Sequence, residues 1–257
     1  MWNDDVDEIG RRWSNLLGRG RARISGAPRV TGRPPSANGA SSLHLLWVVP
    51  PGQELVEASV SLLVPTLPGV PRLYFWALQV TFSAGAGAHL GLQWGADSPR
   101  RLRHVNWGGY GPSGAELSGE PSKLPSSFAN PNTRDYDWHP GRSYRLRIAR
   151  EAGRWAGWVD DTLVRCLEAP GDTLCYPMVW SEAFADCDDP SVSVRWSDLE
   201  VVTRSGRCLR IDSVEARYQS FHEGGCDNTS SESDGKAFVQ TTNVVRASPP
   251  GALLRVD

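Results

Sequence analysis

The sequence lacks the features that define several large classes of protein. No stretch approaches the roughly 18 consecutive apolar residues that a membrane-spanning helix needs, so we expect no membrane span. Lysine is nearly missing, since Lys123 and Lys236 are the only two, and the formal net charge is -2. With no basic excess to attract phosphate groups, the chain is not expected to bind nucleic acid. Arginine supplies almost all of the positive charge, which is typical of a bacterial gene rich in G and C.

A secretory signal is also missing from the chain as written. Its first residues include Asp4 and Asp5, whereas a signal peptide begins with basic residues and continues with an apolar run. On these residues alone we expect a cytoplasmic protein.

Cysteine is absent from the first 165 residues, and the five that follow form no Cys-x-x-Cys pair and no spacing typical of a metal site. An odd number leaves at least one thiol unpaired. Cys187 and Cys226 both lie among Asp, Gly, Asn and Pro residues, which indicates two loops, and we predict a disulfide between them. The five cysteines are Cys166, Cys175, Cys187, Cys208 and Cys226.

The N-terminal part differs in composition from the rest of the chain. Residues 4–17 place Ile9, Trp13 and Leu17 at helical spacing, which predicts a short amphipathic helix. Residues 18–42 are rich in Gly, Arg, Pro and Ser and are expected to form a flexible linker. We therefore divide the chain into residues 1–42, a helix and an arm, and residues 43–257, a folded domain. The helix either docks on that domain or, through residues 1–17, binds a protein partner.

From residue 43 onward the sequence consists of short β-branched and aromatic runs separated by Gly, Pro, Asn and Asp. Such runs with almost no helix predict an all-β fold, a two-sheet antiparallel jelly-roll sandwich. A hairpin is expected where two runs meet at Gly153, with a second tight turn at Asp160 and Asp161. The predicted strands are 43–49, 55–64, 73–83, 88–94, 101–107, 143–150, 154–159, 162–167, 178–182, 191–202, 214–219 and 237–245.

Three motifs give the sequence a family resemblance. They are His89-Leu-Gly-Leu-Gln93, Val105-Asn-Trp107-Gly and Trp138-His-Pro-Gly141-Arg-Ser-Tyr144-Arg-Leu. Together they resemble a family of domains of unknown function with a concanavalin-like sandwich, of the lectin and glucanase type. The resemblance covers residues 73–196 and implies a jelly roll and extracellular relatives, but no catalytic residue.

Tryptophan is abundant, with 11 residues, and several lie beside glycine. The flat face of an exposed indole can stack on the apolar face of a sugar ring, although most tryptophans in a sandwich fill its core. If residues 95–100 close a hairpin, one group of aromatic and amide side chains comes together as a candidate saccharide site. This predicted ligand site consists of Gln93, Trp94, Asn106, Trp107 and Tyr110.

Carboxylates suggest two further hypotheses. Glu182 and Asp186 are the nearest candidates for the acid pair of a glycoside hydrolase, but their spacing of four places them on one face of a helical turn. A group of acidic residues around the two loop cysteines offers the hard oxygen ligands that calcium prefers. The candidate calcium ligands are Asp186, Asp188, Asp189 and Asp227.

These features favour a carbohydrate-binding or adhesion module of lectin-like type, with a polysaccharide or glycan as its ligand. Two alternatives stay open. One is a glycoside hydrolase or polysaccharide lyase that uses the concave face of the sandwich. The other is a non-enzymatic interaction protein that docks through its N-terminal helix.

Overall fold

The computed structural model describes residues 31–95, 103–126 and 128–257. The predicted amphipathic helix over residues 4–17 lies outside these ranges. Within them, no helix has the length and apolar character needed to cross a bilayer.

The described residues form sixteen strands and one short 3-10 helix. All twelve predicted strands are present, and the prediction missed four short ones, β6, β12, β14 and β16. The elements are β1 (Ser41–Trp47), β2 (Leu55–Leu63), β3 (Tyr74–Phe82), β4 (Gly87–Trp94), β5 (Arg103–Tyr110), β6 (Thr133–Asp135), β7 (Ser143–Glu151), β8 (Arg154–Val159), β9 (Thr162–Leu167), β10 (Leu174–Ala183), β11 (Ser193–Thr203), β12 (Cys208–Arg210), β13 (Ser213–Tyr218), η1 (Phe221–Glu223), β14 (Thr229–Ser233), β15 (Phe238–Thr242) and β16 (Leu253–Arg255).

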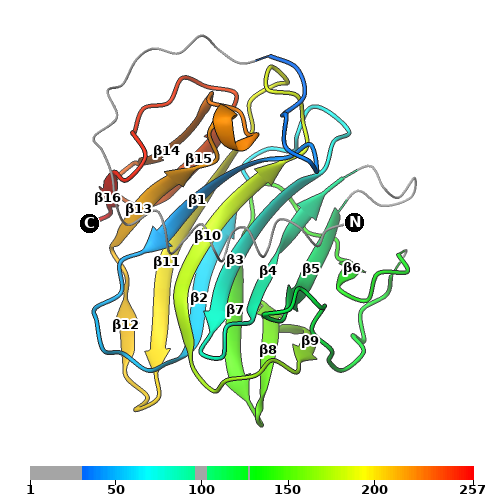
Figure 1. Cartoon of the computed structure of the whole chain (residues 1–257), viewed down its shortest axis with the longest axis vertical. Helices are drawn as coiled ribbons and strands as arrows, with labels where there is room; N and C mark the ends of the chain where they lie inside the picture. The colour runs from blue at the N-terminus through cyan, green and yellow to red at the C-terminus, as the bar shows by residue number, and fades with distance from the viewer. Residues whose placement is uncertain (1–30, 96–102, 127) are drawn as a thin grey trace.

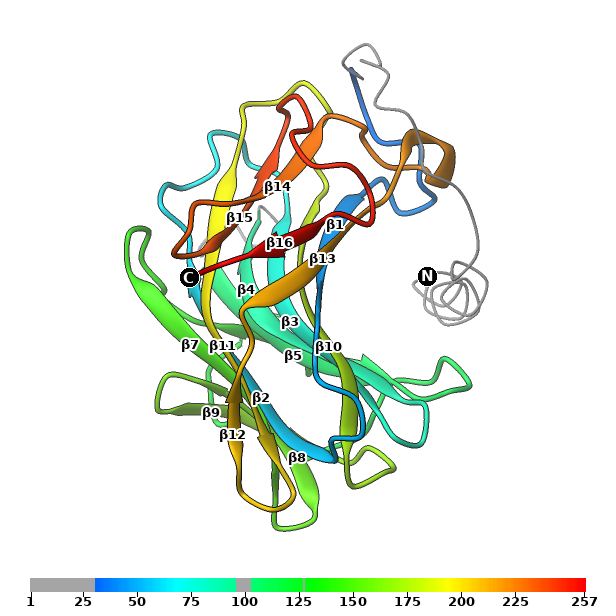
Figure 2. The same cartoon turned by 90° about the vertical axis from the view of Figure 1, so that its left-hand side faces the viewer.

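The strands form two packed antiparallel layers, which confirms the predicted all-β sandwich (Figure 1). The front sheet has the order β16-β13-β1-β10-β3-β4-β5-β6. The back sheet has the order β14-β15-β11-β2-β7-β8-β9, with β12 also paired to β11. The layers join where Leu174 of β10 pairs with Leu55 of β2. The front sheet bows, so that its outer surface is concave (Figure 2).

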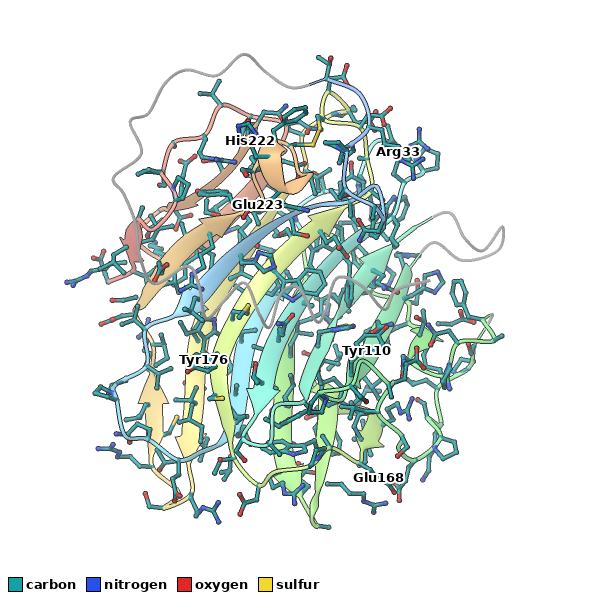
Figure 3. The ribbon with its side chains drawn as sticks, viewed as in Figure 1. Arg33, Tyr110, Glu168, Tyr176, His222 and Glu223 are labelled. Carbon is teal, nitrogen blue, oxygen red and sulfur yellow. A yellow bond between two sulfur atoms is a disulfide. The ribbon has the colours of Figure 1, made fainter. Side chains whose placement is uncertain are left out.

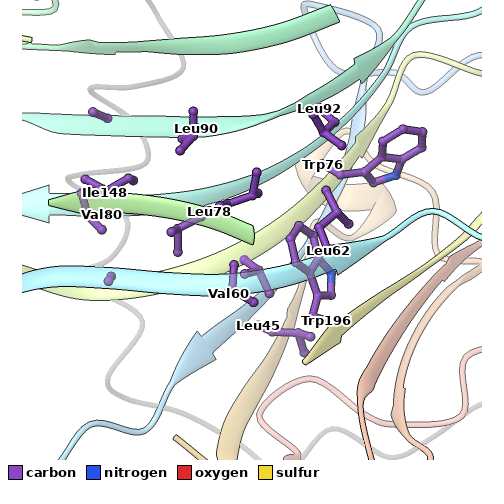
Figure 4. Packing of buried hydrophobic residues seen from close by; sticks show 14 of the residues in the cluster. Leu45, Val60, Leu62, Trp76, Leu78, Val80, Leu90, Leu92, Ile148 and Trp196 are labelled. Atoms are coloured by element: carbon purple, nitrogen blue, oxygen red, sulfur yellow. The ribbon is translucent and has the colours of Figure 1, made fainter. Parts of the chain in front are cut away.

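The core lies between the two sheets and follows from the two-residue period of the strands. In β1, Leu43, Leu45 and Trp47 are buried, while the residues between them are only partly covered. Because successive side chains point to opposite faces, each strand contributes every second residue to the interior. Figure 4 shows Trp76 of the front sheet and Trp196 of the back sheet in this layer, and both are almost completely buried. Each such large side chain stabilises the fold by roughly 1.5–3 kcal/mol.

The two predicted tight turns are confirmed. β7 and β8 pair as a hairpin whose turn contains Ala152 and Gly153, at φ 45° and 80°. Two successive residues with positive φ are typical of a type I′ turn, which matches the twist of the strands it joins. Asp160, at φ 49°, turns the chain from β8 into β9.

The predicted disulfide is confirmed, and it anchors the start of the described chain. Cys187 and Cys226 are bonded, with their Cα atoms 5.6 Å apart. The Cys187 amide donates a hydrogen bond to the Gly32 carbonyl (2.7 Å), and the Gly32 amide donates to the Asp188 carboxylate (2.8 Å). The Ser36 amide likewise donates to the Gly224 carbonyl. The backbone groups of Gly32 and Ser36 are thus hydrogen-bonded to these loops, and Ser41 and Ser42 are already part of β1. The division of the chain at residue 42 stays a prediction.

Candidate functional site

The outer surfaces of the two sheets differ in chemistry. On the back sheet, Arg147 lies 2.9 Å from Glu57 and 2.8 Å from Glu151, and Arg145 pairs with Glu200. These partly exposed pairs satisfy one another and contribute little to stability. The outer surface of the back sheet is therefore a charge-paired, solvated face.

The outer surface of the front sheet, called the front face below, carries an aromatic cluster instead. The Trp180 ring on β10 meets the Phe75 ring on β3 edge to face, with centroids 4.9 Å apart. The imidazoles of His89 and His44 lie 5.9 Å and 6.2 Å from the Trp180 ring. Four strands, β1, β10, β3 and β4, thus bring two aromatic rings and two imidazoles together on the side of the front sheet that faces away from the main core. The two rings are buried there, since Phe75 is 5% and Trp180 is 7% exposed, and they pack in a second, smaller apolar cluster.

Both imidazoles of this cluster are neutral at physiological pH. Burial lowers the pKa of His44 to about 4, with a smaller contribution from the positive charge of Arg217. Burial also lowers the pKa of His89 to about 4, against a weaker opposing effect of the Asn106 side chain. A neutral imidazole offers one hydrogen-bond donor and one acceptor. One of these groups is already used in His89, which hydrogen-bonds to the Asn106 side chain.

Amide and carboxylate groups surround the cluster. Gln79, Gln93 and Glu182 lie on the front face and are partly exposed. The strand register places Glu182 opposite Phe75, and Phe75 opposite Gln93. Among the described residues, no side chain or backbone group bonds to the Trp180 indole nitrogen. The front face therefore combines apolar rings with hydrogen-bonding groups, as saccharide sites do.

The carboxylates on the described strands of the front sheet are too far apart to act as a glycosidase pair. The described strands of the front sheet carry three: Glu182 on β10, Glu215 on β13 and Asp135 on β6. From the register, the backbone of Glu182 lies about 16 Å from that of Glu215 and about 19 Å from that of Asp135. A glycosidase needs its two carboxyl groups about 5–10 Å apart.

The structure divides the predicted ligand site between two faces. Gln93, Asn106 and Tyr110 lie on the front face, and the Asn106 amide donates to the Thr133 hydroxyl (2.9 Å). Trp107 must be removed from the site, because Val105, Trp107 and Gly109 form the inward half of β5 and Trp107 is completely buried.

Trp94, the remaining residue of the predicted site, packs against the core from the edge of the sandwich. Its indole nitrogen donates to the Val70 carbonyl (3.3 Å). Because its ring packs on the core and its indole nitrogen is already bonded, we leave the partly buried Trp94 outside the candidate site.

The catalytic candidates do not share a helical turn, so that part of the prediction was wrong. Glu182 lies within strand β10, and Asp186 lies in the loop that follows it. The Asp186 carboxylate approaches Arg72 at 4.0 Å, at the end of the sandwich. The reason is that β10 continues to Ala183, so Glu182 has an extended backbone and the four-residue spacing crosses the end of a strand.

The four predicted calcium ligands lie on or beside the two disulfide-linked loops. Asp188 and Asp189 accept hydrogen bonds from the backbone amides of Gly32 and Asp186, and Asp227 accepts one from the Phe221 amide. In the part of the chain that the structure describes, no three His, Cys, Asp or Glu side chains converge as a metal site requires. Calcium binding by these residues stays a prediction.

Sequence reasoning missed the centre of the front face. Trp180 and Glu182 share a face in the predicted strand 178–182, so their common orientation could have been inferred from alternation. Phe75 and His89 could not have been added, because they come from strands about 100 residues away in the sequence.

Comparisons with known proteins give no family. No family model matches the chain, and neither does any curated protein. The resemblance to a domain family of unknown function therefore stays a prediction.

Solved structures with a similar fold are distant. Scytalido-glutamic peptidase with a peptide-based transition state analog is 11% identical, at a TM-score of 0.43, and covers 80% of this chain and 98% of its own. The carbohydrate-binding module CBM66 from Bacillus subtilis is 12% identical, at a TM-score of 0.35, over 64% of this chain and 95% of its own. Congerin II with lactose is 10% identical, at a TM-score of 0.36, over 68% of this chain and 99% of its own. Similarities this weak carry no argument about activity or ligand.

Proposed function

We propose that this protein is a carbohydrate-binding module whose ligand lies on the front face. The observation that supports the proposal is the cluster of Trp180, Phe75, His44 and His89 on the outward side of the front sheet. The two aromatic rings are themselves buried, and the partly exposed amide side chains of Gln79 and Gln93 lie on the same side. Aromatic rings bind the apolar faces of sugars, and imidazole and amide groups bind their hydroxyls.

The charges around the cluster favour a neutral glycan over an acidic one. Both histidines are uncharged, and the one arginine nearby on β13, Arg217, has the carboxylate of Glu215 at 2.8 Å. An acidic polysaccharide would need unpaired cations for its carboxylate or sulfate groups. We therefore expect a neutral polysaccharide.

Binding without hydrolysis is favoured by the wide spacing of the carboxylates on the front face. Glu182 has no second carboxylate on the described strands of the front sheet at the distance that either glycosidase mechanism uses. The disulfide supports an oxidising, extracellular setting, in which polysaccharides occur.

The test is a binding screen of the full chain against neutral and acidic polysaccharides, with and without calcium, followed by an assay for new reducing ends. We expect saturable binding of a neutral polysaccharide, no product, and loss of binding in Trp180→Ala. Trp158→Ala is the control for the loss of a tryptophan elsewhere, because Trp158 lies on the outer surface of the back sheet and is partly exposed. Product release would make the protein an enzyme, and no binding to any polysaccharide would reject the proposal.

A further inference from the structure

Tyr176 occupies an irregular position in the middle of the front sheet. Strand β10 pairs with β3 at Cys175 and again at Met178, but two residues, Tyr176 and Pro177, stand opposite Val80 alone. This is a β-bulge, an extra residue that bends a strand and redirects a side chain. Pro177 has no amide hydrogen to donate to the ladder, which fits its place in the bulge.

The bulge holds Tyr176 in a strained conformation. Its φ is 50°, and it is the only aromatic residue among the five described non-glycine residues with positive φ. A bulky side chain rarely adopts this region, and such strain persists only where the surrounding structure imposes it. The backbone strain is not offset by packing of the ring, because the same side chain is 66% exposed.

The strain places the phenol ring in solvent. Leu174 is buried and Cys175 faces outward, so a regular strand would point residue 176 toward the core. Positive φ at the bulge turns the ring out instead. Tyr176 is the only tyrosine among the exposed large side chains of the described residues.

A second tyrosine lies across the sheet from it. The register runs from Cys175 through Thr81 and Gly87 to Tyr110, so Tyr176 and Tyr110 are separated by three strand spacings, about 14 Å. Figure 3 shows the two tyrosines on either side of β3 and β4. Tyr110 is partly exposed, and burial raises its pKa, so its phenol keeps its proton.

The surface between the two tyrosines is small and polar. Thr81 and Gly87 lie directly between them, and Gln79 and His89 form the next row. A methyl group on Gly87 would meet its nearest neighbour, the Val80 carbonyl, at 3.8 Å, an ordinary contact. A small side chain would therefore fit at position 87, so packing does not explain why this residue is glycine.

We propose that Tyr176 and Tyr110 are contact residues for an extended glycan chain that crosses β10, β3, β4 and β5. This inference rests on the proposed function and deepens it, since it assigns an oligosaccharide or polysaccharide rather than a single sugar. Position 176 also lies four residues along β10 from Trp180, about 13 Å, so the aromatic contacts extend over more than one sugar ring.

The experiment measures the affinity of the full chain for β-1,3-linked and β-1,4-linked glucose oligomers, from the monomer to the hexamer, by titration calorimetry. Affinity should rise with oligomer length. Tyr176→Gly should lower the affinity for the longest oligomers about tenfold and leave the affinity for the shortest ones unchanged. Glycine accepts positive φ, so this variant should also have a higher Tm than the wild type. Loss of binding with a gain in stability cannot come from misfolding.

Two further variants complete the test. Gly87→Val adds a side chain between the tyrosines and should lower the affinity for long oligomers in the same way. Phe221→Ala removes an exposed aromatic residue elsewhere and should leave the affinity unchanged. Wild-type affinity of Tyr176→Gly for the hexamer, while Trp180→Ala fails to bind, would overturn this inference and leave the proposed function standing. If the wild type binds none of the oligomers and no neutral polysaccharide, both are rejected.

Discussion

Phe75 and Trp180 meet edge to face on the outward side of the front sheet, where both are buried, with their ring planes at 75° and their centroids 4.9 Å apart. Their backbones belong to adjacent strands, but the residues are offset, because Phe75 pairs with Glu182 and Trp180 with Ala77. Edge-to-face geometry is the favourable arrangement for two aromatic rings.

We expect the Phe75 and Trp180 rings to stabilise each other measurably. A double-mutant cycle of Phe75→Leu and Trp180→Leu, followed by urea unfolding, should give a coupling energy of about 0.5–1.5 kcal/mol. The same cycle with Trp158→Leu in place of Trp180→Leu provides the control, since Trp158 lies on the other sheet. A coupling indistinguishable from that control would mean that the rings are merely adjacent.

Stability should fall as the pH drops below about 6.5. The pKa values of His44 and His89 are lowered to about 4 in the folded protein, whereas unfolded histidine titrates near 6.5. Between these values the unfolded chain binds more protons, so the free energy of unfolding rises with pH by up to about 1.4 kcal/mol per pH unit for each histidine. The stabilisation is complete above pH 6.5 and is lost as the pH falls toward 4.

Urea unfolding at a series of pH values measures this slope. His44→Gln and His89→Gln should each reduce it, because glutamine does not titrate. His222→Gln, in η1, is the control for a histidine of this chain at another position. Equal slopes in all four proteins would contradict the assignment.

Removal of the disulfide should destabilise the protein by about 3–4 kcal/mol, because the bond closes a long loop in the unfolded chain. The cysteines are separated by 39 positions in the sequence. Comparison of the unfolding of Cys187→Ser with that of Cys208→Ser, whose thiol is free and exposed, isolates this effect. If both variants unfold at the same urea concentration, the bond does not constrain the chain.

Trp107 should prove essential for folding rather than for binding. Trp107→Ala removes a completely buried side chain and should cost about 3–5 kcal/mol. Gly157→Ala should also be destabilising, because the new methyl group would lie 2.7 Å from the Trp107 ring. Thermal unfolding of both variants tests this, and a Gly157→Ala protein with unchanged Tm would show that the ring can move away.

The successes and failures of prediction from the sequence have the same physical origin. β-branched and aromatic runs between turn residues predicted long strands such as β1 and β11, because the composition of a strand is a local property. Alternation cannot tell which side of a sheet faces the core, and for that reason Trp107 was assigned to a binding surface. β6, β12 and β16 are three residues long, too short to show a period at all.

The candidate site was less predictable than the fold. Gln93 and Asn106 lie on adjacent strands joined by a single connection, so their proximity follows from one expected hairpin. Trp180 joins them only because β10 pairs with β3, and no local pattern encodes the pairing of two strands so far apart in sequence. Non-local strand pairing is thus the information that the sequence patterns did not supply.

The bulge at Tyr176 and Pro177 bears on how this protein can change by insertion and deletion. Cys175 and Met178 face the same side of the sheet, and one intervening residue would preserve that arrangement on both sides. A strand shorter by one residue would therefore pair without a shift of register, and a single-codon deletion combined with an apolar replacement would give an unbroken ladder. The extra residue adds no pairing partner to the ladder between Cys175 and Met178, so its effects are the local bend of β10 and the outward position of the tyrosine.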